Sequence, residues 1–480
     1  MLLYKKKNNK IFYFIIFIFS VLFITLFFDR SGLEKIRKCR CIGPGIVGEI
    51  DQRLRIFLKA PVLLRSPSIE NNVVIDYSKK IYHAFHNKLK NDHKFNTIKI
   101  DIPFEELEIL RQDRKKALSL NKLVNPRKIN ITIKHKNKKY KATARLKGDL
   151  PEHWQNYNQW SLKIELKNSK TILSMNEFSL MIHSERDFPY NFLFAKIYKD
   201  QKLIIPDYKT VKVNFNGNDW GLMLMEENFG ENFYFKNKIK EAPIFKMTNE
   251  EDFLYGTIYN NKIKNIEEIV RWQGKIETKV YNKDQILKKT NIPFKDTNEN
   301  LLSIFKNIQE ALVIDKKKYS PDLIKYLDLE QFAKVMAVSS IFGDIHSTQV
   351  NNVRYYLNPY DLQVVPILTD QNHSEINEKY FMALPRLYKN LFTNDDFKIK
   401  YLETIQNINQ NLEIYIKEID NICNKYGKVC KDLFDVQVIK KNINYISKQK
   451  KNIFTNIINS DQENKIKKKL NKKLKENIVK

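Results

Sequence analysis

Two aspartates and two asparagines lie between residues 342 and 374, in the stretch FGDIHSTQVNNVRYYLNPYDLQVVPILTDQNHS. Asp344 follows a predicted helix, Asn351 and Asn352 stand at the entry of a predicted hairpin, and Asp370 stands at its exit. Because a hairpin returns the chain to its starting point, we expect Asp370 to lie near Asp344 and the two asparagines. Carboxylate and carboxamide oxygens without an obvious basic partner suit magnesium and phosphate. The same residue types also cap helices and form turns, and these residues alone favour that simpler interpretation.

Several common catalytic motifs are missing. The sequence has no Walker A loop, and no G-x-G-x-x-G can be built from its 12 glycines. It also lacks a G-x-S-x-G nucleophile elbow. His83, His86 and His93 lie near one another, but only the first two share a face of the predicted helix, so solvated histidines are favoured over a metal site. The absence of these motifs excludes the ordinary nucleotide-binding loops.

Hydrophobic periodicity predicts the elements that position these residues. Before residue 230, it indicates strands at 98–102 and 161–167, helices at 74–89, 103–118 and 188–199, and hairpins of 129–133 with 140–144 and of 209–215 with 221–225. The second hairpin turns at Asn216-Gly217, a strong hairpin signal. Later, it indicates helices at 301–312, 328–337 and 443–480 and a hairpin of 353–357 with 363–368. Asp328 is placed to cap the second of these helices.

Five stretches occur in the order found in the CotH family, which comprises the spore-coat protein H kinases and their bacterial relatives. They are ARLKGDLPEHW at 144–154, SLKIELK at 161–167, MNEFSLMIHSERDF at 175–188, VNFNGNDWGLMLMEENF at 213–229, and the stretch at 342–374. The chain resembles this family over about residues 97–375. The resemblance implies a divergent protein-kinase-like fold without the ordinary glycine-rich loop. It also implies phosphate transfer from ATP to protein hydroxyls.

The resemblance assigns roles to the residues of the last stretch. Asp344 resembles the catalytic aspartate, which orients the acceptor hydroxyl and accepts its proton. Asp370 resembles the metal-binding aspartate, and Asn351 or Asn352 would complete a Mg²⁺ site. Electrostatic positioning of this kind is most of what phosphoryl transfer requires.

The resemblance also suggests contacts with the phosphates of ATP. Lys163 is the first candidate, with Glu226 or Glu227 positioning it or holding a second metal, and Arg145 and Lys147 are the alternatives. A solvent-facing strand lysine and a charged strand end are the simpler interpretations of Lys163 and the two glutamates.

The expected fold class is α+β, with a divergent, two-lobed, protein-kinase-like fold behind one N-terminal transmembrane helix. One lobe would be an antiparallel sheet and the other mostly helical. The expected segments are a basic tail at 1–10, an anchor at 11–28, a juxtamembrane linker and helix at 29–96, a sheet-rich region at 97–260, a helical region with the catalytic hairpin at 261–400, and a lysine-rich helical extension at 401–480.

The expected anchor is the uncharged run IFYFIIFIFSVLFITLFF at 11–28. As a helix it would span about 27 Å, close to the hydrocarbon thickness of a bilayer. Lysines precede the run and a second basic cluster follows it, which makes the topology ambiguous. The short lysine-rich tail favours a main domain outside the cytoplasm, although the opposite orientation stays open.

The formal net charge of +29 points to a polyanionic partner, or to the composition of an AT-rich genome. Membrane, a protein substrate and an envelope polymer are the expected partners; no recognisable nucleic-acid-binding module accompanies the charge, which argues against nucleic acid. Cys423 and Cys430 could form a disulfide in an oxidising compartment. The alternative to a CotH-type kinase is a non-catalytic envelope or coat assembly protein with a kinase-like fold.

Overall fold

The structure is a computed structural model that describes residues 46–58, 95–120, 122–148, 151–156, 158–248, 277–281, 321–349 and 352–449. These residues divide into two compact units. The first unit contains the described residues up to Phe188, together with Tyr208–Asn228 and Asp420–Leu433. The second contains Pro189–Asp207, the described residues of Phe229–Ile419, and those from Phe434 onward.

The first unit is built on a closed barrel of seven strands in the order β1-β2-β3-β4-β5-β7-β6. The strands are β1 (Asn96–Asp101), β2 (Ile129–His135), β3 (Lys138–Leu146), β4 (Leu162–Leu166), β5 (Glu177–Met181), β6 (Tyr208–Phe215) and β7 (Asn218–Glu227). Neighbouring strands pair antiparallel except β1 and β6, which pair parallel and close the barrel. Alternate apolar side chains fill its interior, as expected for a small barrel.

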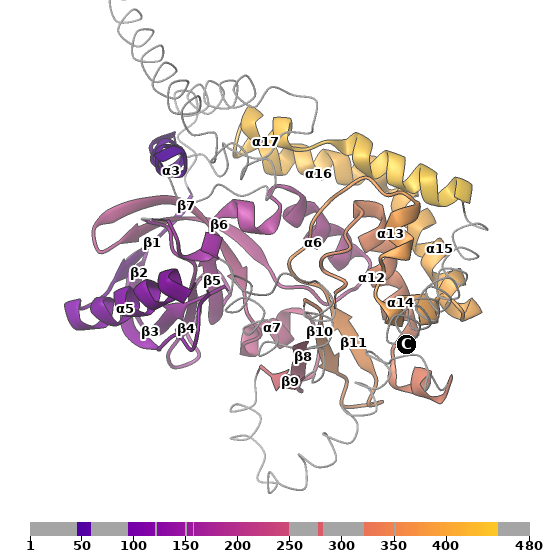
Figure 1. The fold of residues 1–480 in the computed structure, drawn as a ribbon, viewed down its shortest axis with the longest axis horizontal. Coiled ribbons are helices and arrows are strands. Elements are labelled where there is room, and N and C mark those ends of the chain that lie inside the picture. Colours follow the sequence, from indigo (N-terminus) through magenta and orange to yellow (C-terminus); the bar gives the residue numbers. More distant parts are fainter. Residues whose placement is uncertain are drawn as a thin grey trace, which may run out of the picture. The chain divides into compact units, whose positions relative to one another are not determined.

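Two α-helices lie against the barrel wall (Figure 1). Helix α5 (Phe104–Leu120) packs on β2 and β3, and α3 (Ile46–Leu58) packs on β7. Short 3₁₀ helices η1 (Pro151–His153) and η2 (His183–Arg186) follow β3 and β5. The β6–β7 turn places both Asn216 and Gly217 at positive φ, which explains why this dipeptide is a strong hairpin signal.

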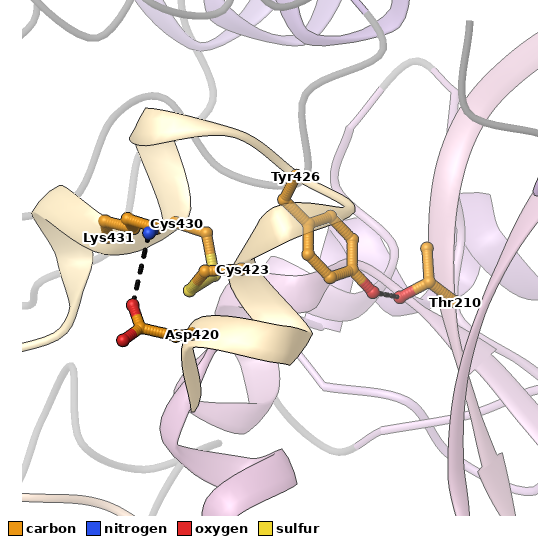
Figure 2. Close-up of a disulfide and its surroundings, with 6 residues drawn as sticks. All are labelled: Thr210, Asp420, Cys423, Tyr426, Cys430 and Lys431. Carbon is orange, nitrogen blue, oxygen red and sulfur yellow. Dashed lines mark hydrogen bonds and ion pairs between the residues drawn. A yellow bond between two sulfur atoms is a disulfide. The ribbon is translucent and has the colours of Figure 1, made fainter. Parts of the chain in front are cut away.

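A disulfide joins Cys423 and Cys430 in the first unit (Figure 2). Cys423 is near the end of α16 (Leu412–Asn424), and Cys430 is in α17 (Lys428–Leu433). Tyr426, between them, points its ring toward the barrel, where its hydroxyl is hydrogen-bonded to Thr210 of β6. The bridged loop is therefore attached to the barrel wall through Tyr426.

The second unit combines a small sheet with helices. Its strands lie in the order β11-β10-β8-β9 and are β8 (Ile244–Thr248), β9 (Glu277–Val280), β10 (Arg354–Leu357) and β11 (Val364–Ile367). Its helices include α6 (Tyr190–Asp200), α7 (Glu231–Lys236), η3 (Pro321–Tyr326), α12 (Leu329–Phe342), α13 (Glu378–Met382), α14 (Arg386–Leu391), α15 (Asp395–Gln410) and the first part of α16. Helix α12 packs against α15, α6 and β11, and its last turns are buried.

The predicted two-lobed, kinase-like fold is wrong. Instead of the predicted lobe built on an antiparallel sheet, the described residues contain a closed seven-stranded barrel, and the second unit contains a separate four-stranded sheet together with its helices. The physical reason is the partner of β1. The alternation of Ile98 and Ile100 predicts a strand, but it carries no information on whether that strand ends a sheet or closes a barrel with β6.

Many of the predicted elements are confirmed. The hairpins β2–β3, β6–β7 and β10–β11 form, as do helices α5, α6 and α12, and Asp328 accepts a hydrogen bond from the Gln331 amide at the start of α12. The predicted helices at 74–89 and 301–312 lie outside the described residues. So does the predicted anchor at 11–28; among the described helices, none is long and apolar enough to cross a membrane.

Candidate functional site

A buried carboxylate in the first unit, that of Glu226, pairs with two basic side chains. Glu226 lies at the end of β7, and only 5% of its side chain is exposed. Lys147, just after β3, donates from Nζ to Glu226 Oε2 at 2.8 Å. Arg186, at the end of η2, donates from Nε to Oε1 at 2.8 Å and from Nη2 to Oε2 at 3.2 Å. A buried carboxylate needs such pairing, and here one carboxylate holds two positive groups in place.

The electrostatics agree with this geometry. Burial alone would raise the pKa of Glu226, but the charges and hydrogen bonds of Arg186 and Lys147 outweigh it and lower the pKa from 4.5 to about 2. Burial lowers the pKa of Lys147, and the attraction of Glu226 opposes that effect. About a quarter of the Lys147 side chain stays exposed. The cluster therefore combines a lysine whose side chain is partly exposed with a firmly ionised carboxylate.

Lys163, the first candidate for a phosphate contact, has a different partner. Its Nζ lies 3.6 Å from Glu177 Oε2. The lysine that pairs with Glu226 is Lys147, which was only an alternative candidate from the sequence. Arg145 donates from Nη1 to the carbonyl of Leu146 at 3.1 Å.

These residues nevertheless follow one row across the barrel. Arg145 pairs in register with Lys163, Lys163 with Ser179, and Ser179 with Glu226, and directly paired residues point to the same face. Glu227 is the next residue along β7 and pairs with the core residue Phe178, so it points to the opposite face and is buried. Arg145, Lys163 and Glu226 therefore lie on one surface of the barrel.

In the second unit, Asp344 follows directly on α12. The helix ends at Phe342, and Gly343, with a φ of 64°, forms a left-handed cap; the Asp344 amide donates to the Ser339 carbonyl at 2.8 Å. The Asp344 carboxylate is fully buried and accepts hydrogen bonds from the Ser347 amide at 3.0 Å and from the Ser347 hydroxyl. Burial raises its pKa from 3.8 to about 6, although the bonds from Ser347 oppose the shift.

His346 connects the other predicted residues of this stretch. Its Nε2 lies 3.1 Å from Asp370 Oδ2, and its carbonyl accepts a hydrogen bond from Asn352 Nδ2 at 2.8 Å. Thr369 donates to the Asn352 carbonyl at 3.2 Å, which joins the two ends of the β10–β11 hairpin. Asp370 and Asn352 therefore both contact His346, the first at its ring and the second at its backbone carbonyl. Asn351 lies outside the described residues.

The donor chemistry here fits Mg²⁺. Asp370 offers a carboxylate that is about one third exposed, and Asn352 offers a carboxamide whose Nδ2 donates to the His346 carbonyl. Magnesium in phosphoryl-transfer enzymes is commonly bound by one or two protein carboxylates together with substrate phosphates and water. Within the described ranges, no group of three or more His, Cys, Asp or Glu side chains could hold a metal ion.

Two residues with central contacts were not predicted as site residues. Arg186 is the main partner of Glu226, and His346 is the partner of Asp370. Both belong to stretches that carry the family resemblance, IHSER and GDIHS. The presence of Arg186 and His346 within these stretches was the signal that could have identified them. Hydrophobic periodicity does not indicate which carboxylate such a side chain contacts.

The sequence matches the CotH kinase protein family over residues 144–459, more than half of the chain. The chain therefore belongs to the CotH kinase family, and this membership supports a kinase-like function. No curated protein matches the sequence. Strands β1, β2 and most of β3 precede the matched range, so the barrel extends beyond it.

Proposed function

We propose that this protein is an atypical kinase of the CotH type, which transfers phosphate from ATP to a hydroxyl of a protein or another envelope component. The observation that carries the proposal is the Glu226 cluster, in which Lys147 and Arg186 are held on one buried carboxylate in a member of a kinase family. A lysine held by a glutamate can contact phosphates at a fixed position.

In this proposal, Lys147 contacts the phosphates and Glu226 positions it, while Arg186 keeps Glu226 ionised and in place. Lys163 and Arg145, on the same row of the barrel, are further candidates for contact with an anionic ligand. Glu227 has no role in phosphate contact because it points to the opposite face of β7.

In the second unit, taken by itself, Asp370 with Asn351 or Asn352 is the candidate to hold Mg²⁺, which supplies charge neutralisation in phosphoryl transfer. Asp344 would orient the acceptor hydroxyl and take its proton. Its raised pKa favours a base that can accept a proton near neutral pH. Its burial requires the Ser347 contacts to open before a hydroxyl can reach the carboxylate.

The proposal is tested by calorimetric titration of the full chain with ATP and MgCl₂. We expect saturable binding that weakens at least tenfold in Lys147→Met and is unchanged in Lys128→Met. Lys128 is an exposed control whose partner is Glu165 rather than Glu226. Wild-type chain that is folded but binds no nucleotide would contradict the proposal.

A non-catalytic envelope or coat assembly protein is the second candidate. The observation that favours it is the fully buried Asp344 carboxylate, with both oxygens bonded to Ser347 as in a structural turn. Such a protein would use its net charge of +29 to bind an anionic polymer or protein partners. Binding would then weaken steeply with salt, and Asp344→Asn would behave like wild type.

A further inference from the structure

Three buried side chains form a compact group next to the Glu226 cluster. His153 Nδ1 lies 2.6 Å from Glu185 Oε2, and the Ser161 hydroxyl donates to Glu185 Oε1 at 3.2 Å and to Oε2 at 3.0 Å. Only 13% of the His153 side chain and 3% of the Glu185 side chain are exposed, and Ser161 is fully buried. We call His153, Ser161 and Glu185 the clasp.

The clasp is tied to the backbone of Lys147. The Lys147 amide donates to the Ser161 carbonyl at 2.9 Å, and the Ser161 amide donates to the His153 carbonyl at 2.7 Å. The backbone of one clasp member therefore pairs directly with the residue whose amine meets Glu226.

Gly148 strengthens this connection. It has a φ of 93°, and a Cβ added there would lie 2.0 Å from His153 Cγ. The imidazole thus packs directly on the α-carbon of the residue after Lys147. Trp154 donates from Nε1 to the Gly148 carbonyl at 3.1 Å. Residues 153 and 154 together restrict where the backbone at 147 and 148 can lie.

The clasp is also tied to Arg186. Arg186 follows Glu185 in η2, and its Nη1 donates to the Glu185 carbonyl at 2.9 Å. Burial alone would lower the pKa of His153, but the charge and hydrogen bond of Glu185 outweigh it and raise the pKa, which favours an imidazolium paired with Glu185. The clasp therefore holds the main chain next to both side chains that pair with Glu226: it contacts Lys147 and Gly148 on one side and includes Glu185, the residue before Arg186, on the other.

We infer that the clasp is a positioning device, in which His153, Ser161 and Glu185 fix the backbone so that Lys147 and Arg186 meet Glu226 in the geometry that binds phosphate. This inference rests on the proposed nucleotide binding. None of the three side chains needs to touch the nucleotide, because each acts through the main chain of Lys147, Gly148 or Arg186.

The geometric part is tested on the full chain without nucleotide. The Lys147 amine is acylated with a limiting amount of acetic anhydride, and its extent of labelling relative to Lys163 is read by mass spectrometry. We expect His153→Ala and Glu185→Gln to raise relative labelling of Lys147 at least threefold, because its contact with Glu226 loosens. His153→Asn, which keeps a donor near the position of Nδ1, should restore most of the wild-type value.

His135→Ala is the matched control. His135 is another buried histidine of the same unit, and its Nδ1 contacts the Thr97 carbonyl at 3.0 Å, so its loss disturbs the barrel without touching the clasp. The inference would be overturned if labelling of Lys147 rose as much in His135→Ala as in His153→Ala. It would also be overturned if labelling stayed at the wild-type value in both His153→Ala and Glu185→Gln.

A double-mutant cycle adds a second criterion. Gly148→Ala places a methyl group where the imidazole lies, so it should raise Lys147 labelling strongly in wild type and at least threefold less in the His153→Ala background. Backbone strain from the positive φ is common to both backgrounds and cancels in the comparison. Independent, additive effects would contradict direct contact between Gly148 and His153 as the positioning element.

Nucleotide affinity then separates the two claims. If the proposed function holds, ATP affinity falls at least tenfold in His153→Ala and is preserved within about threefold in His135→Ala. Absence of ATP binding in wild type would refute the proposed function, whereas unchanged ATP affinity in His153→Ala, with binding intact in wild type, would refute the clasp as a positioning device.

Discussion

Replacing Glu226 with glutamine should destabilise the first unit in a pH-dependent manner. The change keeps the size of the side chain and removes the charge that Lys147 and Arg186 share. The pKa of Glu226 lies at about 2 in the folded protein against 4.5 ordinarily. A difference of that size corresponds to about 3 kcal/mol of stabilisation at neutral pH. Because the side chain is almost fully buried, solvent screening reduces this figure little.

The sign follows from the direction of the shift. A carboxylate with a lowered pKa stabilises the folded state above its unfolded pKa, and the stabilisation is lost as pH falls through the folded pKa. The difference in unfolding free energy between wild type and Glu226→Gln should therefore be about 3 kcal/mol near pH 7 and shrink between about pH 5 and pH 2.

The assay is urea unfolding of the full chain, followed by tryptophan fluorescence at several pH values. Three of the four tryptophans, Trp154, Trp160 and Trp220, are buried in the barrel core. The control is Glu165→Gln, since Glu165 forms an exposed ion pair with Lys128 and should contribute at most about 1 kcal/mol. A Glu226→Gln variant as stable as wild type, or a difference that does not change with pH, would refute the reasoning.

Three further predictions concern local structure. Cys423→Ser should weaken the attachment of the Tyr426 loop by about 2–3 kcal/mol, measured as faster amide exchange at 424–429 than in wild type, whereas equal exchange would refute it. Gly343→Ala should lower the thermal midpoint more than Gly217→Ala, because a Cβ at Gly343 would lie 2.0 Å from the Ser374 carbonyl oxygen while the one at Gly217 meets nothing within 4 Å; equal midpoints would contradict this. Asp344→Asn should become more stable relative to wild type as pH rises from about 4 to about 6. The raised pKa of the Asp344 carboxyl means that the wild-type protein loses stability over that range, and the asparagine variant does not. A difference in unfolding free energy between the two proteins that stays constant with pH would contradict this.

Local features of the fold could be predicted from the sequence because local physics decides them. The Asn216-Gly217 turn needs two residues that tolerate positive φ, and Asp328 needs only a free amide three residues later to cap α12. The closed barrel could not be predicted in this way. Whether β1 pairs with β6 depends on strand tilt and on contacts between residues more than a hundred positions apart.

The candidate site shows the same division. The resemblance pairs Lys163 with Glu226 or Glu227, whereas in the structure Lys147 rather than Lys163 reaches Glu226, although Lys163 and Glu226 lie on one face. The difference arises after β3, where the positive φ of Gly148 and the packing of His153 fix the direction of the chain. Such a contact between a glycine and a side chain leaves no periodic signal.

The most direct test of the proposed kinase activity is transfer of labelled γ-phosphate from ATP with Mg²⁺ by the full chain, to itself or to an added protein acceptor. We predict stable incorporation by wild type, a loss of at least about 100-fold in Lys147→Met, and wild-type incorporation in the exposed control Lys128→Met. No incorporation by folded wild-type chain across several hydroxyl acceptors, or equal incorporation by wild type and Lys147→Met, would contradict this account.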